Sequence, residues 1–207
     1  MSFRITLAWL HLLMAVGGGT SDAATPARAK WEAPPVQGPL GVQIRTTIYY
    51  GPWQCNQDLM NRCQRKCGAE RYDLMGCIWL ADIKTDWQGR FGIFPVLMGG
   101  RLAIMHCCCK YPKATDAALR RDKWDAARKS FREKWAEEFG RWPAQPDGTS
   151  WPGHHIRDLR YGGDPVAENN VLPVRPDVHD IFSKEYPLCY SGNSQWSKVG
   201  VNRPYVD

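Results

Sequence analysis

Hydrophobic runs long enough to cross a membrane are missing from this 207-residue sequence. The longest apolar run, Ile5–Val16, covers 12 positions, whereas a spanning helix needs about 20 residues. This run follows Arg4 and precedes a stretch of small residues, which is typical of a secretory signal peptide. We therefore expect residues 1–29 to be a signal peptide, cleaved after Ala23 or Ala29. The protein would be secreted or periplasmic, with no stable membrane anchor.

A strong charge of one sign is also absent. The chain has 27 Lys and Arg against 21 Asp and Glu, a net charge of +6, and 43% of its residues are hydrophobic. This composition excludes a fibrous, low-complexity or globally disordered chain, because there is enough apolar material to bury a core. The small basic excess permits attraction to phosphates without establishing it, since basic surfaces are often simply solvated.

Cysteine is missing from the first 54 residues and is frequent afterwards. The eight cysteines are Cys55, Cys63, Cys67, Cys77, Cys107, Cys108, Cys109 and Cys189. An even number in an exported chain favours disulfide bonds, and the spacings lack the paired C-x-x-C knuckles of a structural zinc site. Because seven of them precede residue 110, full pairing requires one bridge between the two ends of the chain. Cys189 is the candidate for that bridge, and its partner stays open.

Residues 30–112 are predicted to form a small disulfide-rich α+β module of unknown role. Its expected elements are a strand at Val42–Tyr50, a helix at Asn56–Lys66 ending at Gly68, and a hairpin of Phe91–Leu97 and Arg101–His106 around Gly99 and Gly100. The helix would place Cys63 and Cys67 on one face, because they are four residues apart.

The longest helical pattern covers Ala117–Phe139 and ends before Gly140. Apolar residues recur on one face at steps of three and four, namely Trp124, Ala127, Phe131, Trp135 and Phe139. The other face carries basic residues interleaved with acidic ones. Two interpretations are open for it: a solvated surface with i, i+4 ion pairs, or a surface that follows phosphates.

Three of the five histidines fall within residues 151–190. The notable residues of this segment are His154, His155, Gly162, Gly163, Asn170 and His179. We expect a strand at the histidine pair, a second strand at Asn170–Leu172, and a helix at Pro176–Tyr186 that Pro187 stops. This order would let His154 on the first strand face His179 on the helix.

The segment resembles the ββα-metal (His-Me) finger of the HNH/endonuclease VII superfamily of nucleases. The glycine pair follows His155 by seven residues, Asn170 follows His155 by fifteen, and His179 follows Asn170 by nine, which is similar to the spacing in colicin DNases. The Gly153-His154-His155 start resembles that of GHH-type bacterial polymorphic toxins. The resemblance implies an α+β fold in which residues 113–207 form an HNH-like nuclease domain behind the disulfide-rich module.

The resemblance also implies a role for each motif residue. His154 and His179 would hold one divalent metal ion, His155 would be the general base that activates water, and Asn170 would brace the finger. Three flanking arginines would contact phosphates or remain solvated, namely Arg157, Arg160 and Arg175. Strict strand alternation would point His155 away from His154, so these roles would require a twisted or irregular first strand.

The segment departs from the colicin pattern at Ser183, where those enzymes supply a further metal-binding histidine. Two imidazoles leave coordination sites to water and phosphate oxygens, which suits Mg²⁺ best, with Mn²⁺, Zn²⁺ or Ni²⁺ as other choices. Asp158 or Asp180 could add a carboxylate, although the motif places neither.

The sequence thus predicts an exported, metal-dependent endonuclease that hydrolyses DNA phosphodiester bonds. As an antibacterial toxin it would have a small acidic immunity protein as a partner. Two alternatives are a non-toxin extracellular nuclease and a secreted disulfide-rich binding protein with a structural metal finger. Trp196 and Tyr205 are expected to complete a core rather than to stack on bases.

Overall fold

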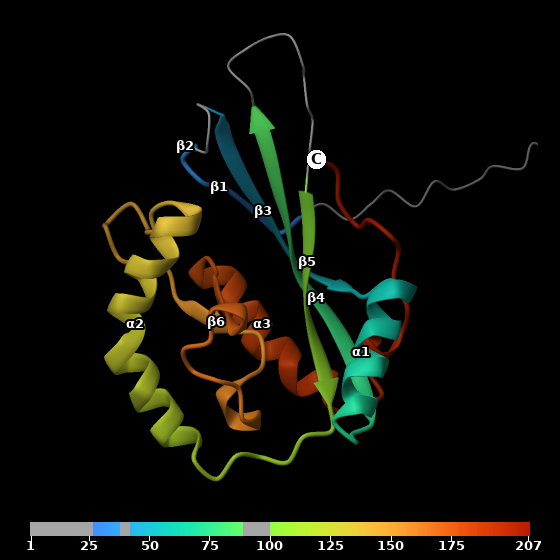
Figure 1. Cartoon of the computed structure of the whole chain (residues 1–207). Coiled ribbons are helices and arrows are strands. Elements are labelled where there is room, and N and C mark those ends of the chain that lie inside the picture. Colours follow the sequence, from blue (N-terminus) through green and yellow to red (C-terminus); the bar gives the residue numbers. More distant parts are fainter. Residues whose placement is uncertain (1–26, 38–41, 89–99) are drawn as a thin grey trace, which may run out of the picture.

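The computed structural model describes residues 27–37, 42–88 and 100–207 (Figure 1). The fold is mixed α+β, as expected. The strands are β1 (Ala29–Glu32), β2 (Val36–Gln37), β3 (Gln43–Gln54), β4 (Leu74–Gln88), β5 (Gly100–Cys109), β6 (Gly153–His155) and β7 (Val171–Pro173). The helices are α1 (Gln57–Ala69), α2 (Ala117–Phe139) and α3 (Pro176–Cys189). Among the described residues, no helix is both long and apolar enough to cross a membrane.

One antiparallel sheet dominates the first half of the chain. Its strand order is β1-β3-β4-β5, and β2 also pairs with β3. The predicted second arm of the hairpin, Arg101–His106, lies on β5 and pairs with β4: Arg101 lies opposite Lys84 and His106 opposite Ile78. The other predicted arm, residues 91–97, lies outside the described residues. Residues 77–82 of β4 are all buried, so this central strand lacks the polar alternation by which half-exposed strands are recognised.

The predicted signal peptide lies almost entirely outside the described residues. Its second proposed cleavage position, Ala29, begins β1, is buried, and pairs with Tyr50. Cleavage after Ala29 would remove this residue from the sheet, whereas cleavage after Ala23 would leave β1 whole.

Helix α1 begins where the sequence predicts. Asn56 caps it, because its side-chain oxygen accepts a hydrogen bond from the Leu59 amide at 2.9 Å. The helix passes the expected stop at Gly68 and ends at Ala69. Its buried face carries Cys63 and Cys67, as their spacing predicts.

All eight cysteines form disulfides, which confirms the prediction and leaves no free thiol for zinc. The pairs are Cys55–Cys77, Cys63–Cys107, Cys67–Cys109 and Cys108–Cys189. The first three join α1 and its neighbourhood to β4 and β5. The fourth is the expected bridge from Cys189 to the first half of the chain, and it closes a sequence separation of 81 residues.

The two halves of the chain share one hydrophobic core. Ile48 and Leu80 of the sheet pack in the same cluster as Val178 and Phe182 of α3. The hydroxyl of Tyr50, on β3, donates a hydrogen bond to the carbonyl of Pro173, on β7, at 2.6 Å. The site-bearing segments β6, β7 and α3 are therefore held directly against the sheet.

Trp196 and Tyr205 complete cores, as expected. Trp196 joins the shared core, whereas Tyr205 belongs to a second cluster around the disulfides of α1. The Tyr205 ring stacks on Tyr49 and Trp53, each with a centroid distance of 4.9 Å. The Tyr205 side chain is 2% exposed, so its ring is not accessible to a nucleic-acid base.

Helix α2 has the predicted bounds and lies on the opposite side of the molecule from α1 (Figure 1). Its apolar face packs in a third cluster, where Trp124 and Phe131 contact Trp142 and Val171. Because Val171 lies on β7, α2 covers the finger from outside.

Helix α3 begins at Pro176, as predicted, but the expected stop at Pro187 is wrong. The helix continues to Cys189, where the disulfide to Cys108 holds its last turn. Proline removes one backbone donor, and near a helix end this loss is tolerated because the following amides still bond, as Tyr190 does to Tyr186 at 3.2 Å.

Candidate active site

The finger is built from β6, β7 and α3. In the β6–β7 pair, His154 lies opposite Leu172 and His155 lies opposite Val171. Packing explains why residue 153, before the histidine pair, is a glycine. A Cβ at Gly153 would come within 2.6 Å of the Trp124 ring of α2. The glycine therefore allows α2 to lie close to the strand that carries both histidines.

The structure brings the three predicted histidines to one pocket of about 360 Å³. Its polar and charged lining residues are Arg121, His154, His155, Asp158, Arg160, His179, Ser183 and Tyr186. The ring centroids of His154 and His179 lie 5.3 Å apart. We call this the histidine pocket.

The two adjacent histidines reach the histidine pocket without an irregular strand. His154 packs against Phe182 of α3, with ring centroids 5.0 Å apart, and His155 packs edge-on against Trp124 of α2 at 5.1 Å. Their side chains thus point to opposite sides, as strand alternation requires. The pocket lies between the two helices, and both rings border it.

Burial lowers the pKa of all three histidines below the ordinary value. For His154 the fall is large, and charge on the neighbouring His179 ring would lower its pKa further. Arg121 adds to the fall in the pKa of His155 and of His179, while the hydrogen bond to the Pro165 carbonyl opposes it at His155. Near pH 7 all three rings are therefore neutral, and each keeps one nitrogen lone pair.

The orientation of His155 is fixed by the loop that follows it. Its Nε2 lies 3.1 Å from the carbonyl oxygen of Pro165. Because a carbonyl oxygen can only accept, Nε2 carries the proton and donates a hydrogen bond to the Pro165 carbonyl. The lone pair of His155 is consequently on Nδ1, where it can accept a proton.

Asn170 braces the loop between the two strands. Its side-chain oxygen accepts from the Arg157 amide at 2.7 Å, and its amide nitrogen donates to the Asp164 carbonyl at 2.7 Å. Gly163 is needed in the same loop, since a Cβ there would lie 1.8 Å from the Arg157 carbonyl oxygen. Asn170 thus holds Asp164, the residue that precedes Pro165, the hydrogen-bond partner of His155.

The three predicted arginines are placed differently. Arg160 lines the histidine pocket, but its guanidinium pairs with Asp158 at 2.7 Å. Arg157 does not line it: the side chain donates to the Tyr161 carbonyl at 2.9 Å and lies over the Tyr111 ring. Arg175, at the start of α3, also lies outside the lining.

Arg175 and Arg160 are both neutralised by a carboxylate two positions away. Arg175 pairs with Asp177 at 2.6 Å, in the same manner as Arg160 with Asp158. Arg121 of α2 is different, because it borders the histidine pocket, is exposed, and its guanidinium makes no hydrogen bond or ion pair with any described residue. The sequence placed it only in a general basic face, and only the packing of α2 on the finger singles it out.

Tyr186 is a second residue that the sequence analysis missed. Its hydroxyl oxygen lies 2.5 Å from Nε2 of His154, and both side chains are buried. One signal was available: Tyr186 follows His179 by seven residues, which puts the two on one face of α3 two turns apart. Buried tyrosines usually find a polar partner, so a site contact could have been considered.

The donor atoms suit a hydrated metal ion better than a closed metal cage. His154 and His179 supply two neutral imidazoles to one pocket. Asp158 borders the same pocket, but its carboxylate already accepts hydrogen bonds from Arg160. Across residues 27–37, 42–88 and 100–207, no group of three or more His, Cys, Asp or Glu is arranged to hold a metal ion. Asp180 is not among the lining residues.

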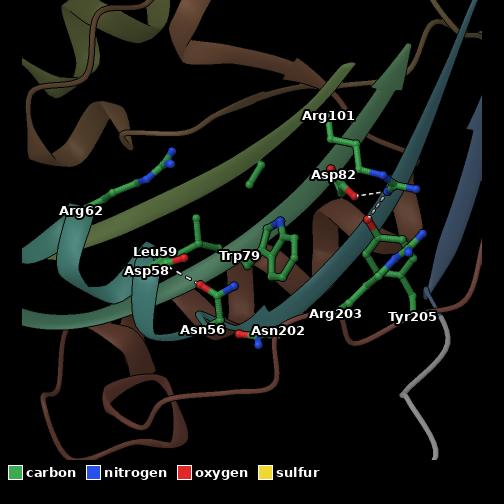
Figure 2. Close-up of a pocket in the computed structure, with 11 residues that line it drawn as sticks. Asn56, Asp58, Leu59, Arg62, Trp79, Asp82, Arg101, Asn202, Arg203 and Tyr205 are labelled. Atoms are coloured by element: carbon green, nitrogen blue, oxygen red, sulfur yellow. Dashed lines mark hydrogen bonds and ion pairs between the residues drawn. The ribbon is translucent and has the colours of Figure 1, made fainter. Parts of the chain in front are cut away.

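A second pocket, of about 310 Å³, lies on the disulfide-rich side and is lined by residues of α1, β4, β5 and the C-terminal segment (Figure 2). Arg101 and Asp82 of this lining form an ion pair, whereas the exposed Arg62 makes no ion pair with any described residue. Arg101 donates to Asp82 at 2.6 Å and to the Tyr205 hydroxyl at 2.9 Å (Figure 2). It also pairs with Asp207. Burial raises the pKa of Asp82, while Arg101 opposes that rise.

The histidine pocket therefore holds a proton acceptor, two further imidazole lone pairs and an unpaired guanidinium. These groups can activate a water molecule, bind a cation and attract an anion in one place. In comparisons with known proteins, no family model, curated protein or solved structure matches the chain.

Proposed function

We propose that the protein is an exported, metal-dependent endonuclease that hydrolyses DNA phosphodiester bonds. The observation that carries this proposal is the convergence of His154, His155 and His179 on one pocket bordered by the unpaired Arg121. The motif spacing of the HNH superfamily supports it independently. The four disulfides are typical of exported proteins and support the compartment.

His155 would be the general base. A phosphodiester is a poor electrophile, so the attacking water must lose a proton as it reacts. The neutral ring of His155, with Nε2 held by Pro165 and a lone pair on Nδ1, is prepared to take that proton. A group with this role contributes about 10²–10⁴-fold to the rate.

His154 and His179 would hold the divalent ion. When bound, the ion would stabilise negative charge on the phosphate and on the leaving oxygen. Two imidazoles leave several coordination positions to water and phosphate oxygens, for which Mg²⁺ is the first ion to test. Imidazole nitrogen itself suits Zn²⁺ and Ni²⁺ better than Mg²⁺, so these two ions and Mn²⁺ are tested beside it. Arg121 would attract the phosphate, since its charge is not neutralised by a neighbouring carboxylate.

Plasmid cleavage tests the proposal directly. The purified, oxidised protein is incubated with supercoiled DNA and Mg²⁺, Mn²⁺, Zn²⁺, Ni²⁺ or EDTA, beside His155→Ala and His179→Ala. We expect metal-dependent nicking, lowered about 10²–10⁴-fold by His155→Ala. Asn169→Ala, at an exposed position of the same finger, is the control and should cleave normally. Absence of cleavage by folded protein with every ion would reject the nuclease and favour a binding protein with a structural metal finger.

The toxin role and an acidic immunity partner follow from the resemblance and from the net charge of +6. A toxin should arrest a bacterium that produces it, and His155→Ala should abolish the arrest. Growth unaffected by a protein that cleaves DNA in vitro would instead favour a non-toxin extracellular nuclease.

A further inference from the structure

Tyr186 occupies the centre of the contact between the finger and the sheet. The side chain is 2% exposed, and its ring stacks on His106 of β5 with a centroid distance of 4.2 Å and an interplanar angle of 12°. Its hydroxyl oxygen lies 2.5 Å from His154 Nε2 and 3.3 Å from the carbonyl oxygen of Ile156. The stack on a strand and the position on α3 leave this hydroxyl little freedom to move.

The single hydroxyl proton has two possible acceptors. If Tyr186 donates to His154 Nε2, the Ile156 carbonyl faces a hydroxyl oxygen that offers it no proton, and His154 must carry its proton on Nδ1. If Tyr186 donates to Ile156, His154 Nε2–H can donate to the hydroxyl oxygen, and both close contacts become hydrogen bonds. The second arrangement turns both contacts of the buried hydroxyl into hydrogen bonds, whereas the first makes only one, so the second is favoured.

We infer that Tyr186 is a positioning residue that holds His154 as the Nε2–H tautomer and so leaves the Nδ1 lone pair for a divalent cation. Metal-binding histidines commonly donate their other N–H to a fixed acceptor, which sets the tautomer and the ring orientation. Here the Tyr186 hydroxyl would be the fixed acceptor, and it would itself donate a hydrogen bond to the Ile156 carbonyl. The cation in this inference is that of the proposed nuclease, so the inference rests on the proposed function.

The tautomer can be measured without metal and without activity. Protein labelled with ¹⁵N-histidine is observed by long-range ¹H–¹⁵N correlation, which distinguishes the protonated from the unprotonated ring nitrogen. In the metal-free wild type we expect His154 to be protonated at Nε2. In Tyr186→Phe, which keeps the ring stack and removes the hydroxyl, we expect a mixture of both tautomers.

Tyr190→Phe is the matched control. Tyr190 lies one turn further along the chain, also contacts His106, with ring centroids 5.5 Å apart, and its buried hydroxyl has no hydrogen-bond partner among the described residues. Removing that hydroxyl should leave the His154 tautomer unchanged.

Metal affinity gives a second readout. Titration with Co²⁺, followed by calorimetry, should show about 10–100-fold weaker binding in Tyr186→Phe, as is usual when a group that orients a metal-binding histidine is removed. Tyr190→Phe should bind Co²⁺ as the wild type does.

Two results would overturn the inference: a wild-type His154 protonated at Nδ1, or a Tyr186→Phe protein with unchanged tautomer and unchanged Co²⁺ affinity. If Tyr186→Phe does not fold, the wild-type tautomer alone decides. A failure of the nuclease is distinguishable, because the expected tautomer and Co²⁺ result together with no plasmid cleavage would reject the enzyme and retain the role of Tyr186.

Discussion

The disulfide-rich sheet and the finger are stabilised by different means. Three disulfides lie within the sheet and α1, where six cysteines themselves form much of a buried cluster. The finger receives only the Cys108–Cys189 bridge and otherwise depends on apolar packing and buried hydrogen bonds. The comparison teaches that the covalent frame surrounds the site but does not build it: every proposed catalytic or metal-binding side chain lies on the less cross-linked part.

The two pockets differ in how their arginine side chains are paired. Arg101 and Arg203 line the second pocket, and both form ion pairs with Asp207, which lies outside that lining. In the histidine pocket Arg121 has no such partner among the described residues. The Arg101–Asp82 pair stabilises the fold, whereas Arg121 leaves positive charge available for a ligand beside the three histidines. Arg62 is also unpaired among the described residues, but no histidine lines its pocket.

Removing the bridge between the two parts should have the largest effect. Cys108→Ala with Cys189→Ala should lower the free energy of unfolding by about 4 kcal/mol, because the unfolded chain regains the entropy of an 81-residue separation. Removing Cys55–Cys77, with a separation of 22, should cost about 3 kcal/mol. Urea unfolding measures both values.

Co²⁺ binding by the same two variants distinguishes the two parts further. Losing Cys108–Cys189 should also weaken Co²⁺ binding, because the end of α3 is released, whereas losing Cys55–Cys77 should not. Equal loss of Co²⁺ affinity in both variants would show that the site depends on the whole disulfide frame.

Acid should weaken the contact between the two parts through His106. Burial lowers its pKa to about 4, with the Ile156 carbonyl opposing the fall. The ring is neutral in the folded protein, so above the unfolded pKa of about 6.5 its burial carries no cost of removing a proton. As the pH falls from about 6.5 toward 4, the unfolded chain binds a proton that the folded protein does not, and the free energy of unfolding decreases. The loss should be on the order of 3 kcal/mol.

His106→Phe keeps a ring against Tyr186 and removes the titrating group. Urea unfolding at pH 7.5 and pH 4.5 should therefore show a smaller loss of stability in this variant than in the wild type. The same loss in both proteins would assign the acid sensitivity to other groups, such as the pocket histidines, whose pKa values are lowered in the same sense.

We expect the smallest effect from substituting the unpaired Arg121 or the ion-paired Arg101. Arg121→Ala, made in a His155→Ala background, should weaken DNA binding about tenfold and reduce the salt dependence by about one phosphate contact. Arg101→Ala should leave DNA binding unchanged and lower the stability instead, because it deprives buried Asp82 of its partner. Fluorescence anisotropy in EDTA at several salt concentrations measures the binding. Equal weakening by both variants would contradict a specific role for Arg121.

Much of the local structure could be predicted from the sequence. The bounds of α2 follow from its periodicity and from Gly140, and the start of α3 follows from Pro176. The strand β4 could not be predicted in this way, because a strand buried in the middle of a sheet has no polar alternation. Without β4, the sequence could not show which strand pairs with β5.

The site residues also divide into those that the sequence identified and those that only the structure identified. The histidines and Asn170 carry spacing that can be compared with a family, so the sequence alone identified them as candidates. Tyr186 and Arg121 carry no motif. Their relevance depends on which neighbours lie within a few ångströms, such as His154 beside the Tyr186 hydroxyl.

By itself, the sequence determined the disulfide chemistry, the helices with clear periodicity and capping residues, and the histidine motif, because each depends on residues close together in the chain or on composition. The tertiary structure decided the pairing of the cysteines, the sheet order, and which arginine remains free at the histidine pocket. These features depend on contacts between residues far apart in the sequence, like that between Tyr50 and Pro173, which are 123 positions apart. Such contacts are selected by the burial of a shared core rather than by local preference.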